Sequence, residues 1–142
     1  MKHNKALLGC AGVHYVCAEL SRQGIIALPT IRNTAGIDIL ASSADGSHHV
    51  AVQVKTGSTG YVWRLSASGR IFEHAVYVLV GLVDGKPPTF HILPGAVMAE
   101  LAQQEHDRWL TTHDDDPVRT LTRPPSEYLD RWDLLGLEGG EP

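Results

Sequence analysis

Apolar and polar residues alternate along the chain in patterns that predict its helices and strands. Near the N-terminus, four apolar residues recur at the spacing of one helix face: Val13, Val16, Cys17 and Leu20. This stripe predicts an amphipathic helix over residues 6–24, with Gly24 as its C-terminal cap. The short apolar run 25–28 follows and predicts a strand that ends at Pro29.

Residues 36–56 predict two strands joined by a tight turn. The first strand covers residues 37–41 and the second covers residues 50–55. The turn between them contains Asp45-Gly46, a typical hairpin signal because glycine accepts a positive φ. The two strands are therefore expected to lie side by side in one sheet.

Three polar residues stand out within this hairpin. Side chains alternate between the two faces of a strand, so Gln53 and Lys55 point to one face and the neighbouring valines to the other. An ammonium group inside an apolar strand is costly unless it has a partner. Asp38, flanked by isoleucines on the first strand, is the natural partner for Lys55.

The rest of the sheet is expected further along the chain. Residues 75–83 form an almost unbroken apolar run, which is typical of a strand buried on both faces. A turn at 84–86 leads to a partner strand at 89–93, and residues 96–110 predict a second helix. The preceding segment, 56–70, is rich in glycine and serine and predicts a loop that includes, at most, one short strand.

The C-terminal part is polar and predicts little regular structure. Residues 111–126 contain three prolines and predict an irregular arm. Ser126 is then expected to cap a short helix over residues 127–135. We therefore predict a core domain over residues 1–110 and a C-terminal arm over residues 111–142 that packs on the same domain.

The predicted order of elements is α-β-β-β-β-β-α-α. This order indicates an α/β fold of the α+β type, with a central mixed β-sheet flanked by helices. The buried apolar run argues that both faces of the sheet are covered. A length of 142 residues suits one domain with its own core and is too short for two ordinary domains.

Composition narrows the cellular setting. Hydrophobic residues at 43% and charged residues at 20% are typical of a soluble globular protein. No apolar run approaches the roughly 20 residues of a membrane helix, and the N-terminus lacks the pattern of a signal peptide. Cys10 and Cys17 lie two turns apart on one predicted helix, too far for a disulfide. We therefore expect a cytoplasmic protein that does not act at a membrane.

The net charge of −4 is unevenly distributed. Residues 1–72 hold seven Lys or Arg and three acids, a balance of +4, whereas residues 73–142 hold five Lys or Arg and thirteen acids, a balance of −8. The basic half contains the polar hairpin. This is compatible with a phosphate-facing side and equally with an ordinary solvated surface.

Asp38, followed by a hairpin and the triplet Gln53-Val54-Lys55, resembles the motif of the PD-(D/E)XK nuclease superfamily, in the variant with Gln in place of the second acid. The resemblance covers residues 8–110 and includes restriction-endonuclease-like domains and Holliday-junction resolvases. It implies a restriction-endonuclease-like fold and a metal-dependent endonuclease that cleaves phosphodiester bonds of nucleic acid, DNA in the first place. Junction-cleaving relatives act as dimers, so a homodimer is an open expectation.

The same resemblance implies a set of site residues. A Mg²⁺ or Mn²⁺ ion would be held by the Asp38 carboxylate, the Gln53 amide oxygen and the backbone carbonyl of Val54. Lys55 would orient the attacking water and offset negative charge on the phosphate. One charged ligand predicts weaker metal binding than the usual two.

The first helix departs from the superfamily pattern. Many members carry a Glu near the start of this helix, often directly after a Gly, whereas here Gly12 is followed by Val13. Glu19 is the only acid of the helix and lies about 120° further around it. Glu19 is therefore either a fourth catalytic residue or an ordinary surface acid.

Five residues are candidates for contacts with nucleic acid: Arg32, Tyr61, Trp63, Arg64 and Arg70. Four of them lie in the glycine- and serine-rich segment, where aromatic rings can stack on bases and arginines can contact phosphates. A tryptophan beside a strand is more often a core residue, so Trp63 has two interpretations.

Two functions of different classes stay open. The first is a nuclease, favoured by Asp38 and Lys55 on adjacent strands. The second is a non-catalytic module that keeps the fold for nucleic-acid binding or protein interaction, favoured by Val13, by Gln53 and by the acidic net charge. A structural interpretation, in which a buried ion pair of Asp38 with Lys55 fixes strand register, predicts that Asp38, Gln53 and Lys55 are all buried away from any cleft.

Overall fold

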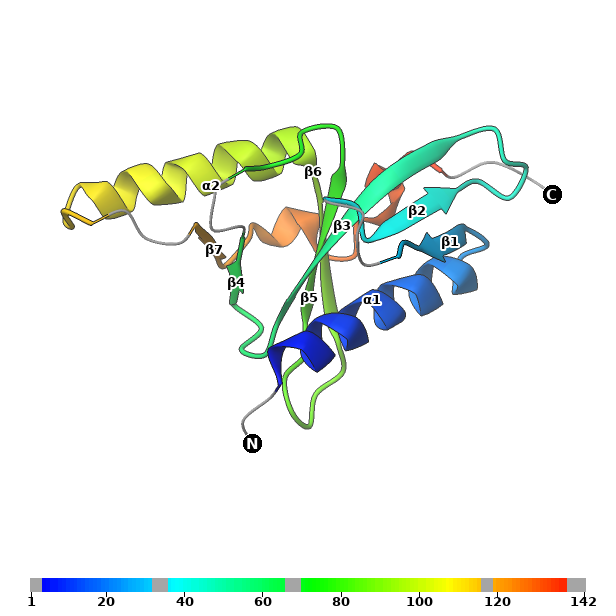
Figure 1. The fold of residues 1–142 in the computed structure, drawn as a ribbon, viewed down its shortest axis with the longest axis horizontal. Helices are drawn as coiled ribbons and strands as arrows, with labels where there is room; N and C mark the ends of the chain where they lie inside the picture. Colours follow the sequence, from blue (N-terminus) through cyan, green and yellow to red (C-terminus); the bar gives the residue numbers. More distant parts are fainter. Residues whose placement is uncertain (1–3, 32–35, 66–69, 116–118, 138–142) are drawn as a thin grey trace.

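The computed structural model describes residues 4–31, 36–65, 70–115 and 119–137. Its centre is a five-stranded sheet in the order β1-β2-β3-β5-β6 (Figure 1). The strands of this sheet are β1 (Ile26–Pro29), β2 (Ile39–Ser42), β3 (His49–Gly57), β5 (Val76–Gly81) and β6 (Thr89–Pro94). The predicted hairpin, the buried central strand and its partner strand are all present in it.

The sheet is mixed. β1, β2 and β3 pair antiparallel, β3 and β5 pair parallel, and β5 and β6 pair antiparallel. Parallel neighbours need a connection that crosses one face of the sheet. This connection carries β4 (Val62–Arg64), which pairs with β7 (Thr120–Thr122) in a second, two-stranded sheet. The sequence did not predict β7, because a three-residue strand within a polar segment has no periodic pattern of its own.

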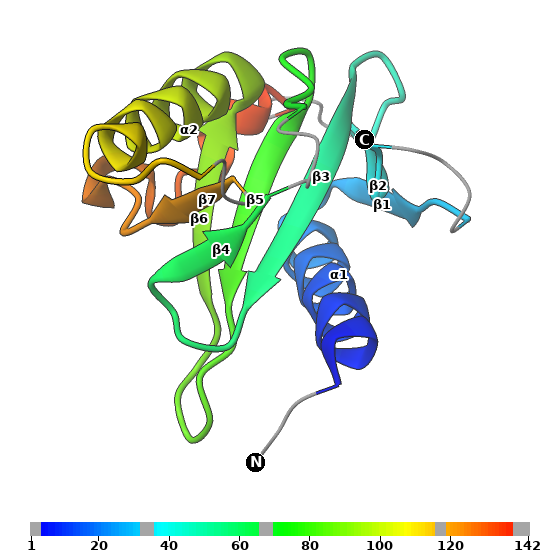
Figure 2. The ribbon, with the colours of Figure 1, turned by 60° about the vertical axis from the view of Figure 1, so that its left-hand side comes forward.

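Helix α1 (Lys5–Arg22) covers one face of the central sheet (Figure 2). Asn4 caps its N-terminus, because the side-chain oxygen accepts the backbone N–H of Ala6 at 2.9 Å. Val16 and Leu20 are fully buried in the core on this face. The predicted helix and its apolar stripe are thus present.

Gly12 sets how closely α1 approaches the sheet. A Cβ at this position would collide with the side chain of Thr56 on β3. The helix therefore lies directly on β3 here, with room for glycine only. This contact fixes the first half of α1 beside the strand that carries the polar motif.

The opposite face is covered by α2 (Gly95–Leu110) and by the small sheet (Figure 2). Met98 of α2 packs in one cluster with Tyr77 and Leu79 of β5. Trp63 of β4 belongs to the same cluster and is fully buried, and its indole N–H donates to the carbonyl of Val80 at 2.9 Å. Both faces of β5 are therefore covered, as its apolar run predicted.

The prediction of an α-helix over residues 127–135 is wrong. Two short 3₁₀ turns are present instead, η1 (Ser126–Tyr128) and η2 (Trp132–Leu135). Asp130 between them has a φ of 53°, a left-handed conformation that interrupts helical hydrogen bonding. The capping role predicted for Ser126 is also wrong, because η1 has no side-chain cap.

Both turns pack against β6 and complete the core. The Trp132 ring lies 5.3 Å from the Phe90 ring, and Leu135 joins the cluster on the α1 face. Leu129 forms an isolated bridge to His91 of β6. The C-terminal segment thus covers the edge of the sheet at β6.

The predicted fold class, a central mixed sheet flanked by helices, is confirmed by this architecture. α1 and α2 lie on opposite faces, and β1 is an edge strand, with no further strand paired to its outer side among the described residues (Figure 1). Within the described ranges, no helix combines the length and apolar character needed to cross a membrane.

Candidate active site

Asp38 lies directly before β2, with its backbone held from both sides. Its N–H donates to the carbonyl of Val52 on β3, and its carbonyl accepts the N–H of Thr30 at the end of β1, each at 2.9 Å. Regular pairing of β2 matches Val52 with Ile39. The hydrogen bond from Asp38 to Val52 is therefore shifted by one residue from the regular pairing. The Asp38 side chain lies at the point where the regular pairing of β2 with β3 begins.

The Asp38 carboxylate is fixed by strand β3. Its Oδ2 accepts the backbone N–H of Val54 at 2.7 Å, a short bond typical of a charged acceptor. Val54 stands between Gln53 and Lys55, so the carboxylate lies beside the triplet that the sequence singled out. The structure thus brings Asp38 and the Gln53-Val54-Lys55 triplet together.

Gln53 and Lys55 sit on the face of β3 away from α1. Their partners on β5 are Tyr77 and Leu79, which both belong to the core cluster of the α2 face. The side-chain oxygen of Gln53 is buried and has no hydrogen-bond partner. Such an orphaned acceptor is costly unless a donor or a cation satisfies it. The unpartnered side-chain oxygen of Gln53 is the structural feature that fits a bound metal ion.

Lys55 is half-buried, and its environment opposes its charge. Burial lowers the pKa of Lys55 below its usual value, and the nearby Asp38 carboxylate partly offsets this. Asp38 and Lys55, both in the described part of the chain, form no direct ion pair, and the bond that holds the Asp38 carboxylate comes from the N–H of Val54. The structure therefore does not contain the ion pair of Asp38 with Lys55 that would fix strand register.

Tyr77 extends the polar cluster across β5. Its hydroxyl accepts the backbone N–H of Phe72 at 3.0 Å. Burial raises the pKa of the Tyr77 hydroxyl, the bond from Phe72 lowers it, and the negative charge of Asp38 raises it further. Asp38 is thus close enough to influence the titration of both Tyr77 and Lys55.

An open cleft of about 500 Å³ lies beside Asp38, under the first half of α1. Its walls are formed by Ala6, Leu7, Gly9, Cys10, Val13, His14, Pro29, Thr30, Ile37, Asp38 and Val54. Val13 faces the same cleft as Asp38, so the position of the missing helix acid is part of this wall. Gln53 and Lys55 are not among the described lining residues, because they lie on the other face of β3.

The cleft also contains a pair that the sequence analysis did not single out. Cys10 and His14 lie four residues apart on α1, and this spacing, which places two side chains on one helix face, was the available signal. Over the described ranges, no three His, Cys, Asp or Glu side chains are grouped so that they could hold a metal ion. Asp38 thus remains the one carboxylate of the candidate metal site among the described residues.

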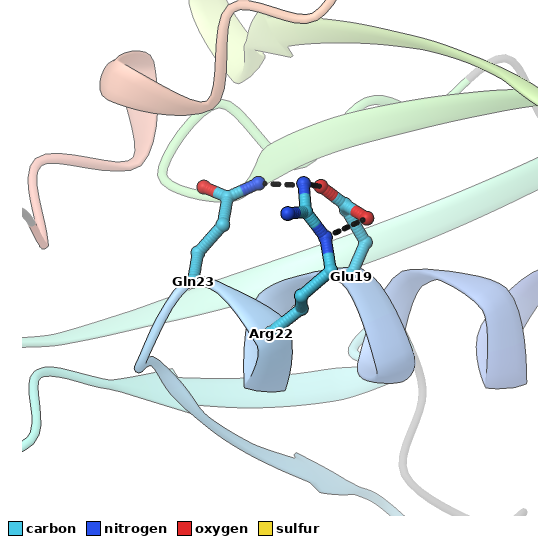
Figure 3. A network of polar contacts seen from close by, with 3 residues as sticks. All are labelled: Glu19, Arg22 and Gln23. Carbon is cyan, nitrogen blue, oxygen red and sulfur yellow. Dashed lines mark hydrogen bonds and ion pairs between the residues drawn. The ribbon is translucent and has the colours of Figure 1, made fainter.

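Glu19 is not part of this arrangement. Its carboxylate forms an ion pair with Arg22 at 2.7 Å and accepts a bond from the Gln23 amide at 2.9 Å (Figure 3). These bonds lower the pKa of Glu19. Glu19 lies in the last turns of α1, whereas the first half of the helix lines the cleft beside Asp38. The structure therefore does not bring Glu19 to the predicted catalytic set, and it supports the alternative of a helix-surface acid.

The predicted stacking role of Trp63 is corrected by the structure. The side chain has no exposed surface, and its N–H is used inside the core. It therefore has no free ring face for a base, and the core interpretation holds. The burial arises because β7, which was not predicted, pairs with β4 and brings Leu121 opposite Trp63.

The other nucleic-acid candidates fall into two groups. Arg70 lies with its guanidinium 4.9 Å from the Phe72 ring, which in turn packs on the backbone of Gly36, two residues before Asp38. The exposed Tyr61 and Arg64 lie instead around β4. Arg32 is outside the described residues.

The mixed sheet, whose β2–β3 hairpin carries Asp38 and the Gln53-Val54-Lys55 triplet, has a helix on each face and adopts the restriction-endonuclease-like fold. The bacterial homing endonuclease I-Ssp6803I is similar to this chain with a TM-score of 0.59, over 94% of this chain and 92% of that chain, at 17% identity. The Holliday junction resolvase Hjc of Archaeoglobus fulgidus matches with a TM-score of 0.41, over 62% of this chain and 78% of that chain, at 18% identity. No protein-family model and no curated protein sequence matches the chain.

Proposed function

We propose that this protein is a metal-dependent nuclease that cleaves phosphodiester bonds of nucleic acid, with DNA as its substrate. One observation carries the proposal: the Asp38 carboxylate is fixed on the N–H of Val54, and Gln53, the residue before Val54, has a buried side-chain oxygen without a hydrogen-bond partner. The fold agrees, because the similar structure I-Ssp6803I is described as an endonuclease.

The residues present fit a Mg²⁺ or Mn²⁺ ion. Asp38 offers a carboxylate, Gln53 an amide oxygen and Val54 its backbone carbonyl, and all three are the hard oxygen ligands that these ions prefer. When bound, the ion supplies positive charge to the phosphoryl oxygens and lowers the pKa of a coordinated water. The site has a single formal negative charge, so we expect weak binding.

Lys55 carries the remaining chemistry in this proposal. Its ammonium, on the same strand face as Gln53, would donate a hydrogen bond to the scissile phosphate or to the attacking water. Desolvation strengthens such a contact, because a half-buried charge is poorly screened by solvent. The Asp38 carboxylate favours the ammonium form of Lys55, because its negative charge opposes the effect of burial on the pKa of Lys55.

The second candidate function is a non-catalytic nucleic-acid-binding or protein-interaction module. The observation in its favour is Val13, which occupies the cleft wall beside Asp38 where the superfamily resemblance expects an acid. With one carboxylate, the metal site has less charge than its relatives use.

A nuclease assay separates the two functions. Labelled duplex, nicked, flap and junction DNA and a matching RNA are incubated with the purified protein in Mg²⁺ and in Mn²⁺. We expect cleavage that is lost in Lys55→Ala and in Asp38→Ala and kept in Glu19→Gln, the matched carboxylate control on α1. Cleavage that survives both Lys55→Ala and Asp38→Ala contradicts the proposed site. Binding without cleavage by the wild type supports the module.

A cytoplasmic location and a homodimer belong to the same proposal. Cys10 and Cys17 are both free thiols, which agrees with a reducing compartment. The edge strand β1 presents the exposed side chains of Ile26 and Leu28, a surface to which a second copy could add. Sedimentation velocity over a range of protein concentrations tests the dimer, and a monomer at every concentration contradicts it.

A further inference from the structure

A second cavity lies between the C-terminal half of α2 and the small β4–β7 sheet. Its volume is about 490 Å³, within the roughly 300–1,000 Å³ of small-ligand sites. Three arginines come to it from three elements: Arg64 from β4, Arg108 from α2 and Arg119 from the segment before β7. It shares no described lining residue with the cleft beside Asp38.

The cavity has a net positive lining. Glu105 is the one acid among its described lining residues, and its carboxylate is already used by β7. It accepts the N–H of Thr122 at 2.8 Å, the hydroxyl of Thr122 at 2.7 Å and the hydroxyl of Thr120 at 3.2 Å. Glu105 therefore ties α2 to the small sheet, and the guanidinium groups set the charge offered to a ligand.

Apart from Arg64, the described residues that line this positive site come from the acidic half of the chain. Residues 73–142 have a balance of −8, yet two of their five Lys or Arg residues line this one cavity. An arginine offers a planar fork of donors that matches the oxygens of a phosphate. Three such side chains around one cavity therefore favour an anionic group with several oxygens.

An aromatic surface stands next to the arginines. Trp109 lines the cavity with 39% of its surface exposed, and its ring is stacked on the His113 ring with centroids 3.6 Å apart and planes 10° apart. A held, partly exposed indole is the kind of surface on which a nucleobase stacks. Trp109 is thus unlike Trp63, which is inside the core.

We propose that this cavity binds a nucleotide unit, with its phosphate on Arg64, Arg108 and Arg119 and its base on Trp109. The inference rests on the proposed function in that it adds a second place where the substrate of a nuclease is held, remote from the candidate cleavage site. The ligand chemistry is a phosphate ester joined to an aromatic base. A free mononucleotide and one unit of a single strand both provide it.

The test is calorimetric titration of the full-length protein in EDTA, so that metal-dependent binding at Asp38 does not contribute. The probes are thymidine 5′-monophosphate, thymidine, inorganic phosphate and the trinucleotide of thymidine. We expect the monophosphate to bind at least about tenfold more tightly than thymidine or phosphate alone, because it uses both the charged and the stacking contacts. Tighter binding of the trinucleotide identifies a single strand as the source, and equal binding identifies the free nucleotide.

Arg108→Gln is expected to weaken binding of the monophosphate about tenfold, since one charge-assisted contact is lost. Arg131→Gln is the matched control, because Arg131 is exposed, pairs with Asp133 near η2 and does not line the cavity. Asp38→Ala should bind the nucleotide as the wild type does, so loss of cleavage and loss of this site are separable. No binding of any probe, an unchanged affinity in Arg108→Gln, or inorganic phosphate binding as tightly as the nucleotide overturns the inference.

Discussion

Lys55 has a folded environment that opposes its ionisation. Burial lowers its pKa more than Asp38 raises it, so the folded state disfavours the ammonium. Lys55→Met keeps the length of the side chain and removes the charge. We expect this variant to have a higher melting temperature at neutral pH and no nuclease activity, measured by circular dichroism and by the cleavage assay. A lower melting temperature would show that Lys55 stabilises the fold.

The pH dependence of stability gives an independent control. Because the pKa of Lys55 in the folded state lies below the usual 10.5, the unfolded state binds more protons between these two values. The free energy of unfolding of the wild type therefore rises with pH through that alkaline window. Lys55→Met should lack this contribution in urea unfolding experiments over the same range.

Asp38 combines a structural bond with the only formal charge proposed for the metal site. Asp38→Asn keeps an oxygen that can accept the N–H of Val54, so we expect little change in the melting temperature. Calorimetric titration with Mn²⁺ should nevertheless lose its binding signal, because the charged ligand is gone. Equal Mn²⁺ binding in the wild type and in Asp38→Asn would remove Asp38 from the site.

The position of a residue could be predicted where neighbouring residues in the sequence determine it, and could not where a distant element does. Strand alternation and the hairpin turn were enough to bring Asp38 beside the triplet that contains Lys55. Glu19 was left open because its partners, Arg22 and Gln23, compete with any distant partner. Trp63 was ambiguous because its burial depends on β7, which pairs with it from far along the chain.

At the scale of elements, the contact between α1 and β3 rests on Gly12. Gly12→Ala would drive a methyl group into Thr56, and overpacking of this kind typically costs about 1–3 kcal/mol. Gly9→Ala is the matched control on the same helix, because a Cβ at Gly9 meets nothing within 4 Å. It should stabilise the protein by roughly 0.5–1 kcal/mol through helix propensity. Chemical denaturation of both variants tests this, and equal effects would contradict the close packing.

The first half of α1 also offers a way to rebuild the missing acid. Val13→Glu places a second carboxylate in the cleft wall beside Asp38, and metal affinity rises with the number of charged ligands. We expect Mn²⁺ to bind at least about tenfold more tightly than to the wild type. Val13→Gln removes the same packing without adding charge and should bind as the wild type does. Equal affinities in the two variants would place the metal away from this cleft.

Helices and strands with a clear pattern of apolar residues in the sequence could be predicted, and those without such a pattern could not. The apolar stripe of α1 and the continuous apolar run of β5 gave both elements within a few residues of their ends. β7 exists because α2 and β4 hold it, through Glu105 and through strand pairing. The helix predicted over residues 127–135 had apolar positions at suitable spacing, but Asp130 turns the chain between η1 and η2.

For the whole molecule, the proposed function predicts that arginines lie along the path of the nucleic acid. Arg70 lies over the Phe72 ring, and this ring packs on Gly36, two residues before Asp38. Arg70→Gln should lower the slope of log affinity against log salt by about one unit, since one phosphate contact is lost. Arg131→Gln removes the same charge near η2 and should leave the slope unchanged. Fluorescence anisotropy with labelled DNA over a salt series measures both, and an unaltered slope in Arg70→Gln contradicts this path.

The overall layout was predictable because a few strong signals agreed. The buried run of β5, the hairpin before it and a helix on each side indicate a covered mixed sheet. The parallel pairing of β3 with β5 has no periodic signature, so the sequence did not predict the order of the strands within the sheet. The cavity beside α2 could not be predicted, because three separate elements build it.

The closure of the core by the C-terminal turns has a consequence for the growing chain on the ribosome. Trp132 and Leu135 share the buried cluster with Val16 and Leu20 of α1 but are made more than a hundred residues later. At typical rates of synthesis, α1 waits about 6–24 s for them. Once β6 has been made, Phe90 and the edge of this strand lack their cover until the C-terminal turns follow, about 40 residues later. The nascent chain therefore exposes an aggregation-prone strand edge until η2 has been translated. A chaperone that binds the nascent chain is most useful during this interval.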